Sequence, residues 1–266
     1  MKLDCHCHIL PGIDDGAKDI DEAVFLASWL VKHGYEKAIC TSHCSMYFRN
    51  TPQTVMDAYN LLRDELERQG VKLEIFPSME YRLTEETWPE VLANNWLMPW
   101  EGNHILIELP LHEPAQMGNL KPIEEIHRLI AEGYQPVMAH PERYTFLEMD
   151  DIHALKDAGA EFQRNLGSFE GWYDENVSVR ARQMETEGLF YWVGTDLHNY
   201  LYADFFENHV FSNAKHTVGL VLACLNGSNP FLYSCPVIFT KVSINNRYKE
   251  HAWVILNYRF VQNTIS

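Results

Sequence analysis

The sequence has 266 residues, of which 46% are hydrophobic and 12% aromatic, so one large or two small globular domains with a sizeable core are expected. The formal net charge of −16 argues against a nucleic-acid-binding protein, because a basic surface is needed to displace the counterions of a phosphate backbone. The sequence also lacks an apolar run of about 18 residues, the length that a membrane-spanning helix requires.

The first residues and the cysteines indicate the cellular compartment. The segment MKLDCHCHILPG reaches acidic and histidine residues at once and leaves no room for a signal peptide, so a cytoplasmic location is expected. Six cysteines, at positions 5, 7, 40, 44, 224 and 235, fit neither a disulfide framework nor a zinc-finger spacing. We interpret them as reduced thiols that are mostly buried.

Short extended segments alternate with longer helical ones along most of the chain. The first helix is expected over 19–34, because Ala23, Leu26 and Leu30 recur at helical spacing before Gly34. Further helices are expected over 51–70, 120–133 and 150–160. The expected strands are 2–9, 36–43, 72–81, 104–111, 134–141, 161–166 and 190–196. This alternation predicts an α/β protein with a parallel sheet, most simply a seven-stranded barrel related to the TIM barrel.

The last fifty residues differ from the rest in composition. Residues 217–266 contain one acidic and four basic side chains, whereas the preceding residues contain 36 acidic and 17 basic ones. We therefore predict a barrel domain over 1–216 and a separate C-terminal segment over 217–266. The segment is interpreted either as a small β appendage or as an interaction segment.

Histidines and carboxylates recur at the carboxyl ends of the expected strands, where barrel enzymes build their active sites. His6 and His8 alternate on the first strand and therefore face the same side. The later strand ends carry His43, Glu80, Glu108, His140, Asp196 and His198. A single histidine at a strand end is usually structural, but eight such residues at one end predict a multinuclear site for manganese, iron or zinc.

Two aspartates leave two interpretations open. Asp14 and Asp15 lie in PGIDDGAKD, between the first strand and the first helix. Either they favour the start of that helix electrostatically, or one of them extends the metal cluster.

The stretch SHCSMYFRN raises a competing chemistry. His43 and Cys44 followed by Arg49 resemble the nucleophile loop of a cysteine-dependent tyrosine phosphatase, in which a thiolate attacks phosphorus. Such loops have five residues between Cys and Arg, whereas here there are four and none is glycine.

DCHCHILPGIDDGAKD closely resembles the opening motif of the PHP (polymerase and histidinol phosphatase) superfamily. Within it, the chain resembles the bacterial manganese-dependent protein-tyrosine phosphatases of capsular and exopolysaccharide operons. The segments TSHC, SMEY, LIELPL, MAHPERY and GTDLHN occur in the expected order over roughly residues 1–200. The resemblance implies a distorted seven-stranded (β/α) barrel with three divalent metal ions, Mn²⁺ first and Fe or Zn as alternatives.

The resemblance also assigns residues to roles. The implied metal ligands are His6, His8, Asp15, His43, Glu80, Glu108, His140, Asp196 and His198. Glu108 would bridge two metals, and Asp15 is preferred over Asp14. Arg143 matches a residue that contacts substrate phosphate, and Asp15 or His198 would act as a general acid. His43 is then the functional residue of SHCSMYFRN, and Cys44 is not the nucleophile.

Three functions follow from these features. The first is hydrolysis of phosphotyrosine in a protein, with a tyrosine autokinase that regulates capsule or exopolysaccharide synthesis as the implied partner. The second is hydrolysis of a small phosphomonoester such as histidinol phosphate. The third is a weakly active regulatory binding protein, suggested by the C-terminal segment and by HNYLYADFFENH, which lacks the arginine that the family usually carries there. For a phosphotyrosine ring, Tyr47, Phe48, Tyr81 and Tyr144 are candidates for an apolar shelf.

Overall fold

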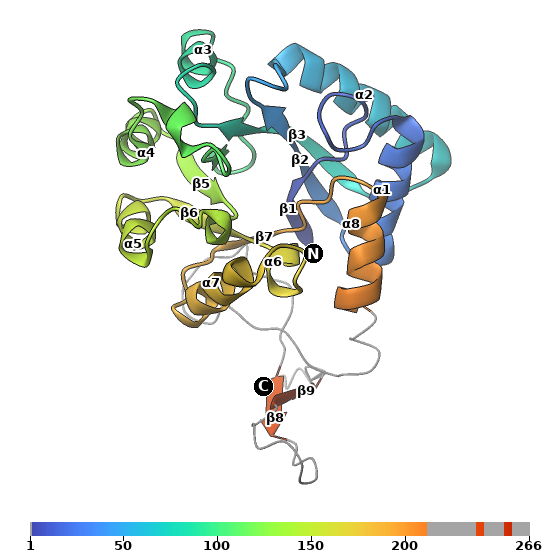
Figure 1. Ribbon diagram of the computed structural model, residues 1–266. Coiled ribbons are helices and arrows are strands. Elements are labelled where there is room, and N and C mark those ends of the chain that lie inside the picture. The colour runs from blue at the N-terminus through green and yellow to red at the C-terminus, as the bar shows by residue number, and fades with distance from the viewer. Residues whose placement is uncertain (1, 212–237, 242–252, 257–266) are drawn as a thin grey trace, which may run out of the picture. The chain divides into compact units, whose positions relative to one another are not determined.

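The computed structural model describes residues 2–211, 238–241 and 253–256. It contains a parallel sheet of seven strands that lie side by side in chain order (Figure 1). The strands are β1 (Leu3–Cys7), β2 (Lys37–Cys44), β3 (Glu74–Arg82), β4 (His104–Glu108), β5 (Gln135–Ala139), β6 (Glu161–Asn165) and β7 (Trp192–Gly194). The seven expected strands and the barrel architecture are therefore confirmed.

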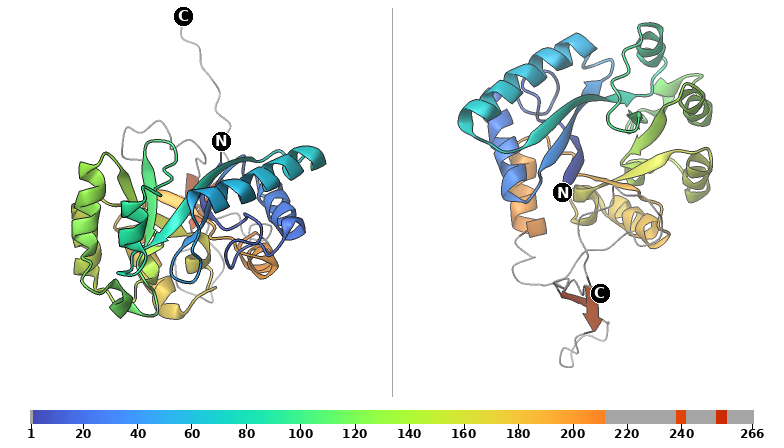
Figure 2. Two further views of the ribbon diagram at one scale, coloured as in Figure 1. Left: turned by 90° about the horizontal axis from the view of Figure 1, so that it is seen from above. Right: turned by 180° about the vertical axis from the view of Figure 1, so that it is seen from behind.

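Helices surround the strands on the outside, as Figures 1 and 2 show from opposite sides. The α-helices are α1 (Ile20–Lys32), α2 (Pro52–Gln69), α3 (Trp88–Ala93), α4 (Pro122–Ala131), α5 (Met149–Asp157), α6 (Leu166–Phe169), α7 (Glu175–Thr186) and α8 (Tyr200–Phe205). Short helical turns are η1 (Pro114–Met117), η2 (Pro141–Arg143) and η3 (Phe206–Phe211). The four expected helices correspond to α1, α2, α4 and α5.

The sequence explains why the first two helices begin where they do. The side chain of Asp19 accepts a hydrogen bond from the backbone N–H of Glu22 and caps α1. Thr51 and Thr54 form a reciprocal capping box at α2, and Pro52 occupies its first position. Gly70, with φ of 72°, ends α2 in the left-handed region. These signals fix the lengths of the loops that follow β1 and β2.

The strand register places side chains of different strands next to each other. His43 on β2 pairs with Glu80 on β3, and Arg82 at the end of β3 pairs with Glu108 at the end of β4. Ile39 and Leu106 belong to a buried apolar cluster and lie on the same faces of their strands as His43 and Glu108. Apolar side chains therefore fill the barrel below its polar carboxyl end.

The barrel closes between its first and last strands through few contacts. His8 donates its backbone N–H to the carbonyl of Leu197, and Asp196 donates to the carbonyl of His6. The buried carboxylate of Asp4 accepts hydrogen bonds from the backbone N–H and the hydroxyl of Thr195, at 2.9 and 2.6 Å. One side chain thus holds β1 against the segment after β7.

We expect Asp4→Ala to lower the free energy of unfolding by roughly 3 kcal/mol, because it leaves the buried N–H of Thr195 without its partner. Denaturant titration would measure the change at equal metal content. Asp64→Ala is the control, since Asp64 is exposed and, among the described residues, its side chain pairs with Arg63 alone. Equal stability of the two variants would contradict this role of Asp4.

Contacts divide the chain into two compact units, Met1–Asp204 and a second that begins at Phe205. The division expected after residue 216 lies outside the described residues and stays a prediction. Within the second unit, β8 (Ile238–Lys241) pairs antiparallel with β9 (Trp253–Leu256). The rest of the predicted segment 217–266 lies outside the described residues. In the described part of the chain, no helix has the length and apolar character to span a membrane.

Candidate metal centre

Histidine and carboxylate side chains converge at the carboxyl ends of the strands. In the described residues, four groups have potential ligand atoms within 4.8 Å of one another. The groups are His8–Asp15–His43–His198, His6–His8–Asp196, His6–Glu80–His140 and His43–Glu80–Glu108. Together they contain all nine ligands expected from the sequence and no other residue. Eight of the nine are buried, and Asp15 is exposed.

Glu80 lies at the centre of the cluster. Its Oε2 is 3.0 Å from Nδ1 of His43, and its Oε1 is 3.2 Å from Nε2 of His140. Neither oxygen accepts a hydrogen bond from a described residue, because these ring nitrogens are close without being correctly directed. A fully buried carboxylate without hydrogen-bond donors is costly unless a cation lies beside it. The arrangement therefore fits bound metal ions.

The histidine tautomers support the same conclusion. Gln163 Oε1 accepts from the backbone N–H of His140 and lies 3.0 Å from Nδ1 of His6, so this nitrogen carries the proton. Nδ1 of His8 likewise faces a carboxylate oxygen of Asp14 at 3.0 Å. The lone pairs on Nε2 of His6 and His8 then face each other at 3.0 Å. Such an arrangement is stable when a cation lies between or beside the two nitrogens.

The pKa of His6 reflects this excess of carboxylate. Burial by itself lowers the pKa of His6, but the negative charges of Glu80 and Asp196 outweigh burial and raise the pKa to about 9. The same negative charges would favour a metal ion beside these nitrogens. Metal ions and protons are expected to compete for these nitrogens.

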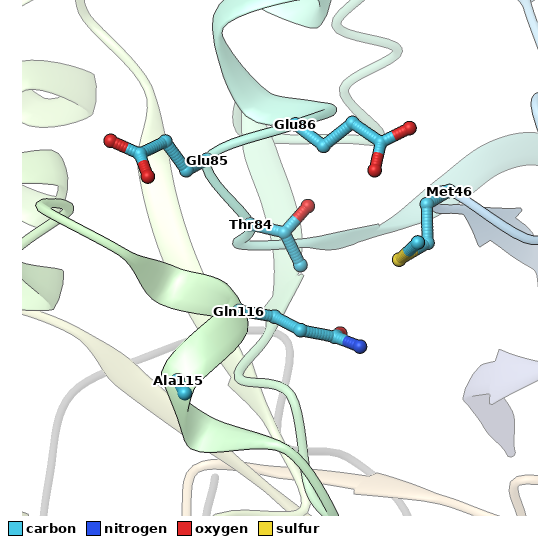
Figure 3. Close-up of a pocket in the computed structure, with 6 residues that line it drawn as sticks. All are labelled: Met46, Thr84, Glu85, Glu86, Ala115 and Gln116. Carbon is cyan, nitrogen blue, oxygen red and sulfur yellow. The ribbon is translucent and has the colours of Figure 1, made fainter.

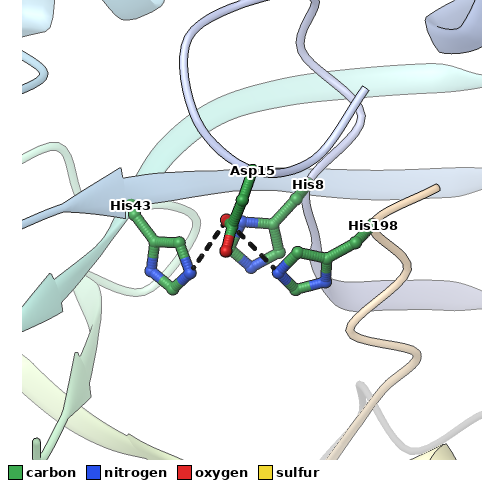
Figure 4. Close-up of side chains that lie close together, drawn as sticks. All are labelled: His8, Asp15, His43 and His198. Carbon is green, nitrogen blue, oxygen red and sulfur yellow. Dashed lines mark ion pairs between the residues drawn. The ribbon is translucent and has the colours of Figure 1, made fainter. Parts of the chain in front are cut away.

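The two consecutive aspartates have different positions. Asp15 extends over the cluster, with Oδ1 3.4 Å from Nε2 of His43 and 3.7 Å from Nε2 of His198 (Figure 4). Asp14 is turned away from the ring Nε2 atoms and accepts hydrogen bonds from His8 and from the backbone N–H of His43. The geometry favours Asp15 as the ligand and Asp14 as the residue that orients His8.

Asp196 connects the cluster to Arg143. Its Oδ2 accepts hydrogen bonds from Asn165, Tyr173 and Arg143 at 2.7, 3.1 and 3.2 Å. Its Oδ1 lies 3.3 Å from Nε2 of His6 and is left for a metal. The guanidinium of Arg143 also lies over the ring of Tyr173, 4.2 Å from the centroid. Arg143 therefore stands at the edge of the cluster, and its contact with phosphate remains a prediction.

Glu108, the residue expected to bridge two metals, has few contacts within the cluster. Its Oε1 is 3.7 Å from Nε2 of His140, and its Oε2 accepts from Nε of Arg82 at 2.7 Å. Glu108 belongs to one group of potential ligands, whereas Glu80 belongs to two. Glu80, rather than Glu108, is therefore shared by two of these groups, and the bridging role of Glu108 stays a prediction.

Backbone constraints position several residues of the cluster. His140 and Asp196 have φ of 31° and 55°, a region that side chains other than glycine rarely adopt. A Cβ on Gly16 would lie 2.0 Å from the carbonyl oxygen of His8, and one on Gly194 would lie 2.5 Å from Cβ of His6. Both glycines thus permit a close approach to a histidine of the cluster.

Cys44 does not have the properties of a nucleophile. Burial, with a smaller contribution from Glu90, raises the pKa of the Cys44 thiol to about 12. Its Sγ faces the carbonyl oxygen of Asn50 at 3.5 Å. Arg49 is exposed and pairs with Glu86 at 2.5 Å, so these two residues form no phosphate-binding loop. His43, in contrast, belongs to two of the ligand groups.

The four aromatic candidates separate into two kinds. Tyr81 and Tyr144 are buried, and their hydroxyls donate to the carbonyls of Trp96 and Ala139, so they are packing residues. Phe48 stacks on His43 with ring centroids 5.9 Å apart, and Tyr47 is 60% exposed. Of the four, Phe48 therefore lies against the cluster, and Tyr47 next to it in sequence is open to solvent.

A pocket of about 400 Å³ lies among the loops that follow β2, β3 and β4 (Figure 3). It is lined by Met46, Thr84, Glu85, Glu86, Ala115 and Gln116. None of these residues belongs to the metal cluster, but they follow His43, Glu80 and Glu108 closely in sequence. The pocket therefore opens at the same end of the barrel as the cluster.

Two residues that hydrogen-bond members of the cluster carry no distinctive sequence motif. Gln163 and Asn165 alternate on β6 and are both fully buried, where one hydrogen-bonds His6 and the other Asp196. The alternation of buried polar residues in EFQRNL was the available signal.

We expect Gln163→Leu to lower metal affinity and turnover by roughly 10- to 100-fold, the usual effect of losing a residue that orients a metal ligand. Gln163→Glu retains an acceptor for His6 and should lose less. Metal analysis after dialysis and initial rates would measure both. If Gln163→Leu bound metal as tightly as the wild type, this positioning role would be ruled out.

Buried histidines and carboxylates at the carboxyl end of a (β/α) barrel define a metal-dependent enzyme of the barrel class. The family model for capsular polysaccharide synthesis, CpsB/CapC, matches residues 2–202. The chain therefore belongs to the CpsB/CapC family.

Known relatives are tyrosine-protein phosphatases. The chain is 30% identical to tyrosine-protein phosphatase YwqE of Bacillus subtilis over 201 residues, which are 74% of this chain and 77% of YwqE. It is 26% identical to the putative tyrosine-protein phosphatase CapC of Staphylococcus aureus over 94% of this chain and 98% of CapC. The CapC alignment therefore extends into residues 217–266.

A solved structure supports the fold independently. It comes from crystallographic work on YwqE from Bacillus subtilis and CpsB from Streptococcus pneumoniae, described as unique metal-dependent tyrosine phosphatases. It matches with a TM-score of 0.68 and 27% identity over 80% of this chain and 86% of the other.

Proposed function

We propose that this chain is a metal-dependent protein-tyrosine phosphatase whose metal ions are bound by the nine-residue cluster. The observation that carries the proposal is the fully buried Glu80 carboxylate, whose oxygens accept no hydrogen bond from the described residues. The names of its relatives, tyrosine-protein phosphatases, support the substrate class. The opening motif further supports membership of the PHP superfamily.

The donor set is consistent with three divalent ions, with Mn²⁺ as the ion that the resemblance implies. Imidazole and carboxylate also accept Fe and Zn, so the ligand types do not select among these metals. His6, His8, Asp15, His43, Glu80, Glu108, His140, Asp196 and His198 would hold the ions. Bound divalent ions would lower the pKa of a coordinated water and stabilise the negative charge of a phosphoryl group in transfer.

The residues around the cluster would bind and orient the substrate. Arg143, held by Asp196 and Tyr173, would place its guanidinium on the phosphate. Asp15 extends over the cluster and is exposed, and either Asp15 or His198 beside it would act as the general acid toward the leaving group. Phe48 and Tyr47 would contact the phenyl ring.

The phosphorylated partner would be a tyrosine kinase that regulates capsule or exopolysaccharide synthesis. The family to which the chain belongs is one of capsular polysaccharide synthesis. The pocket formed by Met46, Thr84 and Gln116 with their neighbours could receive the residues that flank phosphotyrosine. A small phosphomonoester would leave that pocket unused.

A substrate panel tests the proposal. Phosphate release would be measured from a phosphotyrosyl peptide, a phosphoseryl peptide and histidinol phosphate, with manganese present. We expect the highest kcat/KM for the phosphotyrosyl peptide. A preference for histidinol phosphate would instead support a small phosphomonoester as substrate, and no release from any compound would support a binding protein.

A further inference from the structure

We propose that Arg82 is a second phosphate-binding residue beside the cluster, in addition to Arg143. The inference rests on the proposed function, because it assigns a contact to the phosphoryl group of that substrate. Nothing in the sequence analysis singles out Arg82.

The position of Arg82 follows from strand geometry. Arg82 is the last residue of β3 and lies two residues after Glu80, so both side chains point to the same face of the strand. Its register partner is Glu108 on β4, and Nε of Arg82 donates to Oε2 of Glu108 at 2.7 Å. The guanidinium is therefore fixed against one of the proposed metal ligands.

The terminal amino groups of Arg82 are not used by this contact. A guanidinium carries five N–H donors, and the bond to Glu108 uses the one on Nε. The terminal nitrogens form no hydrogen bond or ion pair with the other residues in the described ranges. The side chain is 20% exposed, so solvent or a ligand can reach it. Two parallel N–H groups match two oxygens of a phosphate.

Arg82 and Arg143 are held in the same way. Each guanidinium donates to a cluster carboxylate, Arg82 to Glu108 and Arg143 to Asp196, and each is about one fifth exposed, at 20% and 18%. Arg82 ends β3 and Arg143 lies in η2 after β5, so the two cations reach the cluster from different strand ends. A phosphoryl group bound above the cluster would then meet both guanidinium groups.

Arg49 offers a contrast within the same end of the barrel. Its side chain is 61% exposed, and it pairs with Glu86 and more loosely with Glu90, neither of which belongs to the cluster. Its charge and length match those of Arg82, but within the described ranges it pairs with no potential metal ligand. Arg49 is therefore a matched control for Arg82.

The test uses Arg82→Gln, because the glutamine Nε2 is the same number of bonds from the backbone as the arginine Nε. The variant can keep a donor to Glu108 and loses the charge and the terminal amino groups. Three quantities would be measured on the manganese-loaded protein: metal content, the dissociation constant of inorganic phosphate by calorimetry, and kcat and KM on a phosphotyrosyl peptide.

We expect Arg82→Gln to keep its metal. Its affinity for inorganic phosphate should fall by about 10-fold or more, because charge-assisted hydrogen bonds to the phosphate are lost. Arg82→Lys should lie between this variant and the wild type, and Arg49→Gln should match the wild type. Unchanged phosphate affinity in Arg82→Gln would overturn the proposal, as would wild-type protein that binds no phosphate. Loss of metal along with affinity would also overturn it, since Arg82 would then act only through Glu108.

The same experiment separates this inference from the proposed function. Suppose that the wild-type protein binds phosphate, that Arg82→Gln weakens this binding, and that no phosphate is released from the phosphotyrosyl peptide. This result would contradict the phosphatase activity and support the Arg82 site. If phosphate is released from the peptide but the Arg82→Gln variant binds phosphate as tightly as the wild type, the phosphatase activity is supported and the Arg82 site is contradicted.

Discussion

Glu80→Gln is expected to abolish metal binding and to reduce phosphate release by more than about 100-fold, beyond the loss typical of an orienting residue. Glu80 is fully buried and reaches His43 and His140 with its two oxygens, so it supplies negative charge to two of the ligand groups. An amide of the same size cannot balance the charge of two cations. Metal analysis of the purified variant and initial rates with added manganese would measure the effect.

Glu74→Gln is the matched control for this change. Glu74 lies on the same strand as Glu80, at its other end, where its side chain is 57% exposed and pairs with Lys37. Its replacement should leave metal content and activity at the wild-type level. A Glu80→Gln protein that keeps its metals and most of its activity would show that the cluster does not bind metal through Glu80.

The second large effect is expected at His43 and not at its neighbour Cys44. His43→Asn should lose activity by a similar factor and bind less metal, because His43 belongs to two groups of potential ligands. Cys44→Ser should retain both, because the thiol is buried and its pKa is raised to about 12, which leaves it protonated at neutral pH. Rates and metal content of both variants would be compared with those of the wild type.

The opposite result would identify a different mechanism. If Cys44→Ser lost activity while retaining its metal, and His43→Asn remained active, a thiolate would be the nucleophile. A loss in both variants, with metal lost in both, would instead indicate that Cys44 supports the position of His43 on β2.

The strand order and the location of the site were predictable from the sequence. Runs such as HILIELPL and YQPVMAHP are short and apolar, alternate with helical segments, and end in ionisable residues. Parallel strands present their carboxyl ends at one edge, so His43 and Glu80 were expected to meet, and the register pairs them directly.

The choice between Asp14 and Asp15 could not be made from sequence pattern alone. The two aspartates are adjacent and chemically identical, and both precede a helix. Only the fold of the loop, which packs Gly16 against the backbone of His8, turns Asp14 toward His8 and Asp15 over the cluster.

The residues that hydrogen-bond members of the cluster could not be predicted from the sequence, for a different reason. Gln163, Asn165 and Arg82 are each ordinary in the local sequence, and their role depends on which neighbouring strand end they face. Such cross-strand pairing follows from register, which local patterns do not determine. The left-handed conformations of His140 and Asp196 were likewise not predictable, because positive φ is uncommon even for aspartate and histidine, which adopt it more often than most residues.

Metal-dependent release of phosphate from a phosphotyrosyl peptide is the most direct test of the proposed centre. Protein stripped of metal by a chelator would be titrated with manganese, and the rate and the bound metal would be followed together. We expect no release from the stripped protein and a rate that rises until more than one equivalent of metal is bound. Full activity in the stripped protein would contradict a metal centre formed by these histidines and carboxylates.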